Sequence, residues 1–474
     1  MTRHREAGHH TTMHFDLIVI GAGPAGEAAV HKARALGASV AVVDKRWFGG
    51  SCPHIGCVPS KSLLHGADVH AKGGDYPWSR ASTRRDYMVN RPARASEPDD
   101  ASHVKALEDD GAVVYRGTAR IVGRGRVAVT HEGTTHELES DNVVVAVGST
   151  SKVPPIEGLA EVRPWTNEQA TLARELPRSL LVLGGGPTGC ELAQVFARFG
   201  VPVTIVQSGP RLVPLEHPRN AESIRWALQR DGVAVKLGAR ALQAMAGAGT
   251  DGAHVIVLDD RSTAEGHVVL LAVGRDFPVH DLGLEHYDIA TQGPEAYPRD
   301  GRLRIADGLW IIGDAAGPEL HTHQGHYQGE LAARMALGED VAPDYRALPR
   351  ATYMDPEAAS VGMSLGQARE AGLDAFECVA PFPTTAKGYT VEAETGHVTI
   401  VVDRASRQLV GAAMACPDAS AAIHECVVAI KARVSIDMLA DTIHAFPSTS
   451  RIFNGLFAEA LATLDSSSRG MAGH

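Results

Sequence analysis

The sequence predicts an α/β fold built from two copies of one supersecondary unit. Each copy has a short apolar strand, a glycine-rich turn, a helix and a second strand that ends at a polar residue. The turns occupy residues 21–26 and 184–189, and the polar residues are Asp44 and Gln207. The two turns are 163 positions apart, and so are the two polar residues, which places the copies in register. This spacing indicates an internal duplication of a βαβ unit.

The first copy predicts a dinucleotide site. Residues 15–20 and 39–43 are its expected strands, and the turn between them reads Gly-Ala-Gly-Pro-Ala-Gly. These glycines permit a tight turn, the approach of a pyrophosphate and close packing of the helix. Asp44, eighteen residues after Gly26, can accept hydrogen bonds from a ribose diol.

The second copy predicts another nucleotide site, in which the residue at the end of the second strand is uncharged. Its strands are residues 180–183 and 202–206, and its helix runs to Phe199. Gln207 stands where an acid would normally bind the ribose, so no carboxylate would repel the 2′-phosphate of NADPH. Arg211 either reaches that phosphate or is a solvated loop residue. One cofactor is therefore expected to be a flavin and the other a nicotinamide, NADH or NADPH, with NADPH favoured.

Two cysteines, Cys52 and Cys57, indicate a redox couple. Pro59 suits a first helical turn, and residues 60–69 read as helix, so Cys57 would lie near a positive dipole end that stabilises a thiolate. The alternatives are two buried thiols or half of a zinc site. A zinc site needs a second ligand pair, and the remaining cysteines are scattered singly and are interpreted as buried, inert thiols: Cys190, Cys378, Cys416 and Cys426.

Composition argues against several classes of partner. The 474 residues suffice for about three domains, and 44% of them are apolar. A net charge of −11 without an extended Lys/Arg cluster argues against nucleic acid and anionic membranes, and no uncharged apolar run approaches the length of a membrane span. Residues 1–13 are expected to be a disordered extension rather than a signal peptide, which favours the cytoplasm. In a reducing compartment a Cys52–Cys57 disulfide would be catalytic or regulatory.

Further motifs extend the pattern over nearly the whole chain. They are Val-Ala-Val-Gly-Ser at 145–149, Leu-Ala-Val-Gly-Arg at 271–275, Ile-Ile-Gly-Asp at 311–314 and Asp-Pro-Glu at 355–357. With these motifs the sequence resembles the class I pyridine nucleotide-disulfide oxidoreductases, the family of dihydrolipoamide dehydrogenase, glutathione reductase and mercuric reductase. The resemblance implies a homodimer that contains FAD and uses NAD(P)H.

The resemblance also implies the domain plan. Residues 14–150 and 272–340 would form an FAD-binding domain, residues 151–271 an NAD(P)H-binding domain, and residues 341–474 an α+β dimerisation domain. Residues 75–102, rich in Arg, Asp, Ser and Pro, are interpreted as an excursion from the FAD domain, and residues 343–349 as a linker.

The same resemblance assigns roles to individual residues. Cys57 would contact the flavin as the charge-transfer thiolate, Cys52 would be the exchange thiol, and Lys61 and Glu191 would form an ion pair beside the flavin. The expected FAD-binding residues are Gly21, Gly23, Pro24, Ala25, Gly26, Asp44, Lys45, Gly50, Ser51, Lys61, Ala119, Gly148, Ser149, Gly313, Asp314 and Thr322. The expected NAD(P)H-binding residues are Gly184, Gly186, Gly189, Gln207, Arg211, Gly274 and Arg275.

Three imidazoles within six residues, His321, His323 and His326, invite a metal-binding interpretation. The family has flavin-contacting backbone and an adjoining helix at this place. We therefore expect no metal site.

The C-terminal region departs from the family pattern. Family disulfide reductases carry a His-Pro segment with a Glu five residues after the His, an acid/base pair that reaches the flavin of the partner subunit. Here Phe446 stands at the His position and Arg451 at the Glu position, and His444 is displaced by two residues. Thiol–disulfide exchange with an ordinary disulfide substrate then lacks its proton carrier. Mercuric reductases have a C-terminal cysteine pair instead, and residues 466–474 contain no Cys.

These observations predict an FAD-dependent NAD(P)H oxidoreductase with a redox-active Cys52/Cys57 pair. Its acceptor would be an unusual disulfide, a thiophilic metal ion or another small molecule. One alternative is a diaphorase or quinone reductase that acts directly from the flavin. Another is a flavin-containing redox sensor without catalytic turnover.

Overall fold

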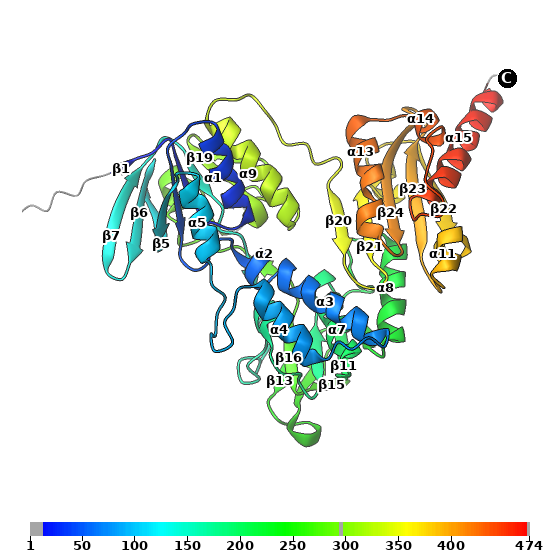
Figure 1. Ribbon diagram of the computed structural model, residues 1–474, viewed down its shortest axis with the longest axis horizontal. Coiled ribbons are helices and arrows are strands. Elements are labelled where there is room, and N and C mark those ends of the chain that lie inside the picture. The colour runs from blue at the N-terminus through cyan, green and yellow to red at the C-terminus, as the bar shows by residue number, and fades with distance from the viewer. Residues whose placement is uncertain (1–12, 293–296, 472–474) are drawn as a thin grey trace, which may run out of the picture. The chain divides into compact units, whose positions relative to one another are not determined.

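The structure is a computed structural model that describes residues 13–292 and 297–471, and the chain forms two compact units (Figure 1). The first contains the chain up to Pro59, Arg85–Ser151 and Arg275–Pro343. The second contains Ser60–Arg84, Lys152–Gly274 and the chain from Asp344 onward. Apart from Met13, the predicted N-terminal extension lies outside the described residues.

A six-stranded sheet of order β18-β19-β8-β2-β3-β4 forms the centre of the first unit. Five of its strands are parallel, and β18 is antiparallel to its neighbour. The strands are β2 (Leu17–Ile20), β3 (Val40–Asp44), β4 (Val113–Arg116), β8 (Val143–Val145), β18 (Arg304–Ala306) and β19 (Leu309–Ile311). All of β2 and most of β3 are buried, as is typical of parallel strands that are covered on both faces.

Alternate residues of these strands pack into two different cores. Leu17 and Val19 join the core beneath helices α1 (Pro24–Ala35), α5 (Ala101–Asp109) and α9 (Thr322–Ala336). Ile18 and Ile20 join the opposite core, which includes residues of a second sheet. That sheet has the order β1-β7-β6-β5 and comprises β1 (Met13–His14), β5 (Thr118–Gly123), β6 (Arg126–His131) and β7 (Thr134–Glu139).

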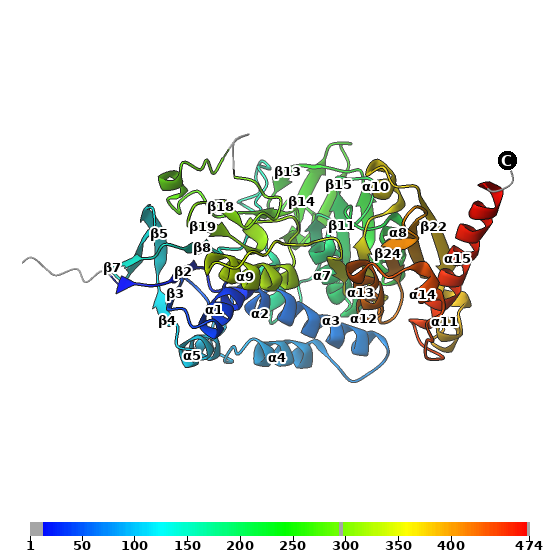
Figure 2. The same ribbon diagram turned by 90° about the horizontal axis from the view of Figure 1, so that it is seen from above.

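Helices α1 and α9 lie side by side, as both views show (Figures 1 and 2). Glycine permits this close approach, because a Cβ on Gly329 of α9 would clash with the backbone of Ala25 in α1. The rest of the first unit consists of short elements: α2 (Ser51–His54), β9 (Thr150–Ser151), β17 (Arg275–Asp276), and the 3-10 turns η2 (Leu284–Tyr287) and η3 (Gly313–Ala315).

The second unit contains a parallel sheet of order β12-β11-β10-β16. Its strands are β10 (Leu180–Leu183), β11 (Val203–Gln207), β12 (Ala234–Leu237) and β16 (Val268–Leu271), and its helices are α6 (Asn167–Leu172), α7 (Pro187–Arg198) and α8 (Pro218–Arg230). An antiparallel sheet adjoins it, formed by β13 (Ala241–Met245), β14 (His254–Leu258) and β15 (Thr263–Gly266), with a 3-10 turn η1 (Thr250–Gly252). The predicted second βαβ copy is therefore present.

The C-terminal part of the second unit is a five-stranded antiparallel sheet of order β20-β21-β24-β23-β22. Its strands are β20 (Pro349–Thr352), β21 (Ala358–Gly362), β22 (Ala375–Pro381), β23 (His397–Asp403) and β24 (Gln408–Ala415). Its helices are α10 (Leu365–Glu370), α11 (Ala386–Thr390), α12 (Ala419–Ala422), α13 (His424–Ala432), α14 (Ile436–Ala440) and α15 (Arg451–Met471), and a 3-10 turn η4 spans Phe382–Thr384. This α+β arrangement confirms the predicted fold class.

Two helices carry the chain from one unit to the other. Helix α3 (Cys57–Ala71) begins three residues before the predicted start, and α4 (Trp78–Met88) occupies part of the segment that was interpreted as an excursion. The predicted domain boundaries remain predictions. Within the described residues, no helix is both long enough and apolar enough to cross a membrane.

Candidate redox and nucleotide-binding sites

The two cysteines lie in the first unit, Cys52 in α2 and Cys57 at the start of α3. Cys52 is half-buried in α2, and Cys57 is the exposed first residue of α3, where the positive end of the helix dipole favours a thiolate. The Cys57 sulfur lies 3.5 Å from the hydroxyl oxygen of Thr322, the first residue of α9. The sequence therefore predicted the pair correctly as neighbours of a helix start, but placed that start too late.

The two thiols are electrostatically unequal. A hydrogen bond with Cys57 raises the pKa of Cys52 well above its ordinary value, and burial and negative charge on Cys57 raise it further. Cys52 is therefore the thiol that keeps its proton when the other ionises. The division of the pair into a charge-transfer thiolate at Cys57 and an exchange thiol at Cys52 stays a prediction.

A buried polar chain lies close to the dithiol in the first unit. The Arg275 guanidinium donates through Nε to Ser149 Oγ at 2.6 Å and through Nη2 to the Ser149 carbonyl at 2.8 Å. Ser149 in turn donates to the Asp314 carboxylate. Burial lowers the pKa of Arg275, while the charges of Asp314 and Cys57 oppose that shift. Three predicted cofactor residues are thus joined, and Arg275, predicted to bind NAD(P)H, contacts residues predicted to bind FAD.

The first glycine-rich turn connects β2 to α1. Gly21 has φ +103°, and a Cβ there would clash with the Ala146 carbonyl, whereas a Cβ on Gly26 would clash with the Gly21 carbonyl. Asp44 ends β3, and its carboxylate accepts hydrogen bonds from the backbone N–H groups of Ala22 and Arg46, both at 2.8 Å. Burial raises the pKa of Asp44 despite these bonds. The acid therefore holds the turn in addition to any contact with a ribose.

The other predicted FAD-binding residues surround this turn. Gly23 caps α1 and Pro24 and Ala25 open it, Gly50 caps α2, and Ser51 begins that helix. Lys45 is exposed after β3, and Ala119 is buried in β5. Gly148 and Gly313 both have positive φ, near the ends of β8 and β19.

The loop that leads to Cys52 is supported by two histidines that the sequence did not single out. The ring of His103, in α5, packs against Gly49 so closely that a Cβ on that glycine would lie 2.6 Å from it. His103 Nδ1 is 2.8 Å from Glu27 Oε1, and this hydrogen bond raises the pKa of His103. The buried ring of His54, which stands between the two cysteines in the sequence, lies with its centroid 5.4 Å from that of His103.

The second glycine-rich turn repeats the first. Gly184 has φ +102°, and a Cβ on Gly189 would clash with the Gly184 carbonyl. Gln207 ends β11, and its side-chain oxygen accepts a hydrogen bond from the Gly185 N–H at 2.9 Å. This is the bond that Asp44 makes to Ala22 in the first copy. Arg211 donates to the Pro214 carbonyl at 2.6 Å, which holds the guanidinium in the loop after β11.

Lys61 and Glu191 form the predicted ion pair. Lys61 Nζ lies 2.7 Å from Glu191 Oε2, and Glu191 is buried. The other carboxylate oxygen accepts the Tyr353 N–H at 2.9 Å, and Lys61 Nζ lies 4.7 Å from the centre of the Tyr353 ring. These contacts hold both charged groups in place.

One face of α7 extends this pair into a larger polar network that the sequence did not indicate. Gln194 exchanges hydrogen bonds with the backbone of Asp355, at 2.9 and 3.0 Å. Arg198, with 6% of its side chain exposed, forms ion pairs with Asp68 at 3.2 Å, Asp231 at 2.7 Å and Asp355 at 2.7 Å. From the sequence, this network could have been anticipated only by the helical spacing that puts three polar residues on one face of α7: Glu191, Gln194 and Arg198. Their partners are distant in the sequence.

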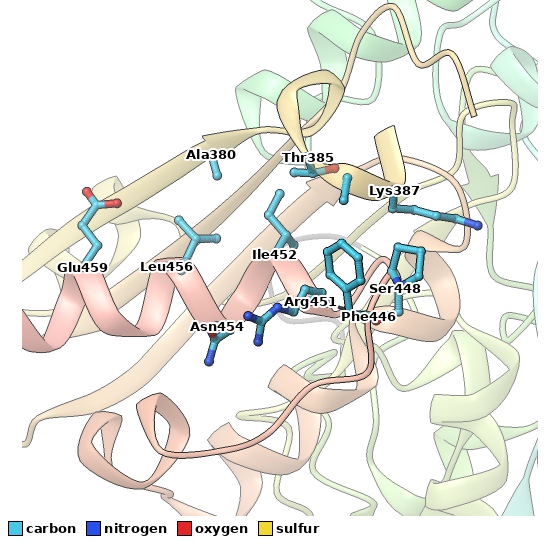
Figure 3. Close-up of a pocket in the computed structure, with 13 residues that line it drawn as sticks. Ala380, Thr385, Lys387, Phe446, Ser448, Arg451, Ile452, Asn454, Leu456 and Glu459 are labelled. Carbon is cyan, nitrogen blue, oxygen red and sulfur yellow. Dashed lines mark hydrogen bonds between the residues drawn. The ribbon is translucent and has the colours of Figure 1, made fainter. Parts of the chain in front are cut away.

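The C-terminal segment has no acid/base pair at the family positions. Phe446 is 73% exposed, and Arg451 is the exposed first residue of α15 (Figure 3). His444 instead lies 2.7 Å from Glu425 Oε1, with 5% of its side chain exposed. The departure predicted from the sequence is therefore present, and His444 is engaged in a separate contact within the second unit.

The histidines near Thr322 have ordinary contacts. The His321 and His323 rings stack with centroids 5.0 Å apart, and His321 Nε2 lies 2.9 Å from Glu319. Across residues 13–292 and 297–471, no three His, Cys, Asp or Glu side chains form a group that could hold a metal ion. The four other cysteines are buried, and burial raises the pKa of Cys378 to about 12.

The glycine that precedes α7 fits a bound dinucleotide. Gly186 has an ordinary φ, and a Cβ there would meet no described protein atom within 4 Å. The protein itself therefore does not require glycine at this position. Close approach of a pyrophosphate to the N-terminus of α7 would require it, because a side chain there would meet the phosphates. In the first unit, Gly148 also faces open space beside Ser149, although its positive φ already favours glycine there.

Comparisons with known proteins agree with this arrangement. The model of the family described as pyridine nucleotide-disulphide oxidoreductase matches residues 15–329, and that of its dimerisation domain matches residues 348–456. Dihydrolipoyl dehydrogenase 3 of Haloarcula marismortui is 28% identical over 451 residues, which cover 92% of this chain and 94% of the relative. Dihydrolipoyl dehydrogenase 3 of Pseudomonas aeruginosa is 30% identical over 453 residues, with 92% and 96% coverage.

Among solved structures, the chain is similar to the HOCl-induced flavoprotein disulfide reductase RclA of Escherichia coli. The identity is 27% and the TM-score 0.82, with 94% of this chain and 99% of that chain covered. The copper(II) complex of the same reductase gives 26% identity, a TM-score of 0.82 and the same coverage.

Proposed function

Because the chain belongs to the pyridine nucleotide-disulphide oxidoreductase family, we propose that it delivers electrons from NADPH to a thiophilic metal ion, with copper(II) as the first candidate. Family membership establishes an FAD-dependent oxidoreductase of the disulfide-reductase type that uses a pyridine nucleotide, and its dimerisation domain supports a homodimer. The acceptor, the preference for NADPH and the roles of single residues are our proposal. A cytoplasmic location also stays a prediction.

The single observation that carries the proposal is a dithiol without an acid/base pair. Cys52 and Cys57 are hydrogen-bonded neighbours at a helix start, whereas Phe446 and Arg451 occupy the positions of the family His and Glu. A disulfide acceptor must be protonated as its sulfur departs, so it needs a positioned acid. A metal ion accepts electrons without accepting a proton. The dithiol supplies what a metal acceptor needs, whereas the residues at the family His and Glu positions do not supply the acid that a disulfide acceptor needs.

The redox balance of the proposed step is simple. The reduced pair, with a thiolate at Cys57 and a thiol at Cys52, gives one electron to each of two copper(II) ions, which become copper(I), while Cys52 loses its proton to solvent and the two sulfurs form one disulfide bond. Soft thiolate ligands favour copper(I), so the product state is stabilised at the same sulfurs. When bound, FAD supplies the two-electron transfer from the nicotinamide to this disulfide. The copper(II) complex known for the RclA relative supports copper as a ligand of this architecture.

The chain's own residues prepare the dithiol and the nucleotide sites. The dipole of α3 favours a thiolate at Cys57, and the raised pKa of Cys52 retains the proton on the other sulfur. Lys61 and Glu191 hold one another in a fixed geometry within the second unit. In the second unit, Gln207 presents an amide in place of a carboxylate, which removes a repulsive charge for a 2′-phosphate and is the reason to favour NADPH.

The test begins with an anaerobic titration of the FAD-loaded protein with NADPH. We expect a long-wavelength charge-transfer absorption that is absent from Cys57→Ser. Turnover is then measured with copper(II), lipoamide, glutathione disulfide and a quinone, each with NADPH and with NADH. Copper(II) reduction that is lost in both Cys52→Ser and Cys57→Ser is expected. Turnover of the quinone alone, unchanged in both variants, would show that the flavin acts directly and would overturn the proposal.

A further inference from the structure

Cys52 lies in α2, a helix of only four residues (Ser51–His54). A single helical turn is not stable by itself, because fixing its backbone costs more free energy than so few hydrogen bonds return. The position of the Cys52 sulfur therefore depends on contacts that anchor this turn to the rest of the first unit.

His54, the last residue of α2, provides such an anchor. It is 2% exposed, and its Nδ1 lies 2.8 Å from the carbonyl oxygen of Gly50, the residue that precedes the helix. A carbonyl oxygen can only accept, so Nδ1 carries the proton of this hydrogen bond. The imidazole thus ties the end of the turn to its beginning, and Cys52 lies between the two tied points.

The His54 imidazole is in turn held by aromatic contacts. Its centroid lies 5.6 Å from that of Trp47 and 5.4 Å from that of His103. His103 belongs to α5, and its Nδ1 lies 2.8 Å from Glu27 Oε1 of α1. Burial lowers the pKa of His54, although the bond to Gly50 opposes the shift, so the ring is neutral at pH 7. The anchor therefore reaches two helices of the first unit without adding a charge beside the dithiol.

A fixed turn favours closure of the disulfide. The Cys52 thiol hydrogen-bonds to Cys57, so the two sulfurs are neighbours before any bond forms between them. A turn that moved freely in the reduced protein would lose conformational freedom when the disulfide closes, whereas an anchored turn has already lost it. The anchoring bond therefore stabilises the disulfide relative to the separate thiols.

We propose that His54 is a positioning residue for the dithiol, because its bond to the Gly50 carbonyl holds α2 in the conformation from which Cys52 closes onto Cys57. The inference rests on the redox role proposed above for the pair, and it does not depend on the identity of the electron acceptor. In the closing step the Cys52 thiol loses its proton, the two sulfurs form one bond, and two electrons leave for the oxidant.

Two amide substitutions separate this hydrogen bond from the other properties of histidine. His54→Asn places an N–H donor at the δ position, where histidine carries Nδ1, whereas His54→Gln places the donor one atom farther from the backbone. We expect His54→Gln to lower the equilibrium constant for disulfide formation about fivefold and His54→Asn to stay within about twofold of the native value. His103→Gln, which removes the support behind the ring, should lower the constant by a smaller factor.

The constant is measured on the full-length, FAD-loaded protein at pH 7, equilibrated without metal ions in mixtures of dithiothreitol and oxidised dithiothreitol. The oxidised reagent accepts the two electrons and becomes the dithiol. After an acid quench and alkylation, mass spectrometry of the tryptic peptide 47–61 gives the disulfide fraction, since this peptide contains Cys52 and Cys57 and none of the other cysteines.

His31→Gln is the matched control, because it removes a histidine of α1 that pairs with Asp110 and has 44% of its side chain exposed, and it should keep the native constant. The urea midpoint of each reduced variant is measured in parallel, because a purely structural role of His54 would lower this midpoint in His54→Gln and leave the disulfide equilibrium unchanged. Equal constants for the native protein, His54→Asn and His54→Gln would overturn this inference alone. A native protein that forms no disulfide in any mixture would overturn the proposed redox role as well.

Discussion

Replacement of Arg198 by methionine should destabilise the second unit more than any exposed ion-pair substitution. The guanidinium is 6% exposed and is the shared partner of Asp68, Asp231 and Asp355. Methionine retains much of the side-chain volume, so the lost quantity is mainly the charge and its hydrogen bonds. The three carboxylates would then repel one another and lose their common donor.

The expected magnitude follows from the exposure of the three partners. Removal of one member of a buried ion pair costs about 3–5 kcal/mol. Asp68 and Asp355 are 33% and 35% exposed, so water compensates them in part, whereas Asp231 is 11% exposed but keeps a contact with Arg230 at 3.1 Å. We therefore expect Arg198→Met to lower the unfolding free energy by the lower end of this range, about 3 kcal/mol. Arg198→Lys should lower it by about half as much, because lysine keeps the positive charge but not the planar set of donors of a guanidinium.

The assay is urea unfolding at pH 7, combined with hydrogen exchange of peptides that contain Asp355. The Asp355 N–H donates to Gln194 on the same face of α7, so its exchange should accelerate in Arg198→Met. Arg178→Gln removes a pair with Asp251 in which the side chains are 66% and 72% exposed, and this control should change the unfolding free energy by less than about 0.5 kcal/mol. Equal stability of Arg198→Met and Arg178→Gln, with unchanged exchange at Asp355, would refute the reasoning.

Three further predictions concern His103 and the two glycine-rich turns. The hydrogen bond with Glu27 raises the pKa of His103, so the stability that this bond contributes is complete below the ordinary histidine pKa of about 6.5 and is lost as pH rises through the raised pKa. The urea midpoint of His103→Gln should therefore decline less between pH 6 and pH 9 than that of the unsubstituted protein. Parallel pH profiles of the two proteins would contradict this prediction. Gly26→Ala should lower the unfolding free energy by about 1–3 kcal/mol, because its Cβ would clash with the Gly21 carbonyl. Gly186→Ala should cost about 1 kcal/mol or less but weaken NADPH binding roughly tenfold in a fluorescence titration, and unaltered affinity would argue against a pyrophosphate at this turn.

The features that the sequence predicted are those fixed by local chemistry. Both glycine-rich turns depend on backbone geometry that only glycine permits, so they were visible as a spaced pattern with the strands on either side. The thiol pair was visible for the same reason, since both cysteines and the following proline lie within eight residues. The Lys61–Glu191 pair was predicted only through the family resemblance, because 130 positions separate its members.

The features that escaped prediction depend on contacts between distant segments. Arg198 meets Asp68, Asp231 and Asp355 only after the second unit has folded, and an arginine in an amphipathic helix gives no sign of three partners. The contact between His444 and Glu425 is similar, since nothing in the spacing of these residues distinguishes it from two surface side chains. The start of α3 was placed too late because Pro59 was taken as its first turn, whereas the helix begins at Cys57.

The end of each duplicated βαβ unit has a consequence for how such proteins diversify. Asp44 and Gln207 make the same hydrogen bond to the turn before them, one through a carboxylate oxygen and the other through an amide oxygen. In both copies an acceptor oxygen at the strand end holds the turn, although the side chain is charged in one copy and neutral in the other. An exchange of acid for amide at this strand end therefore keeps the hydrogen bond to the turn while it changes the charge presented beside it.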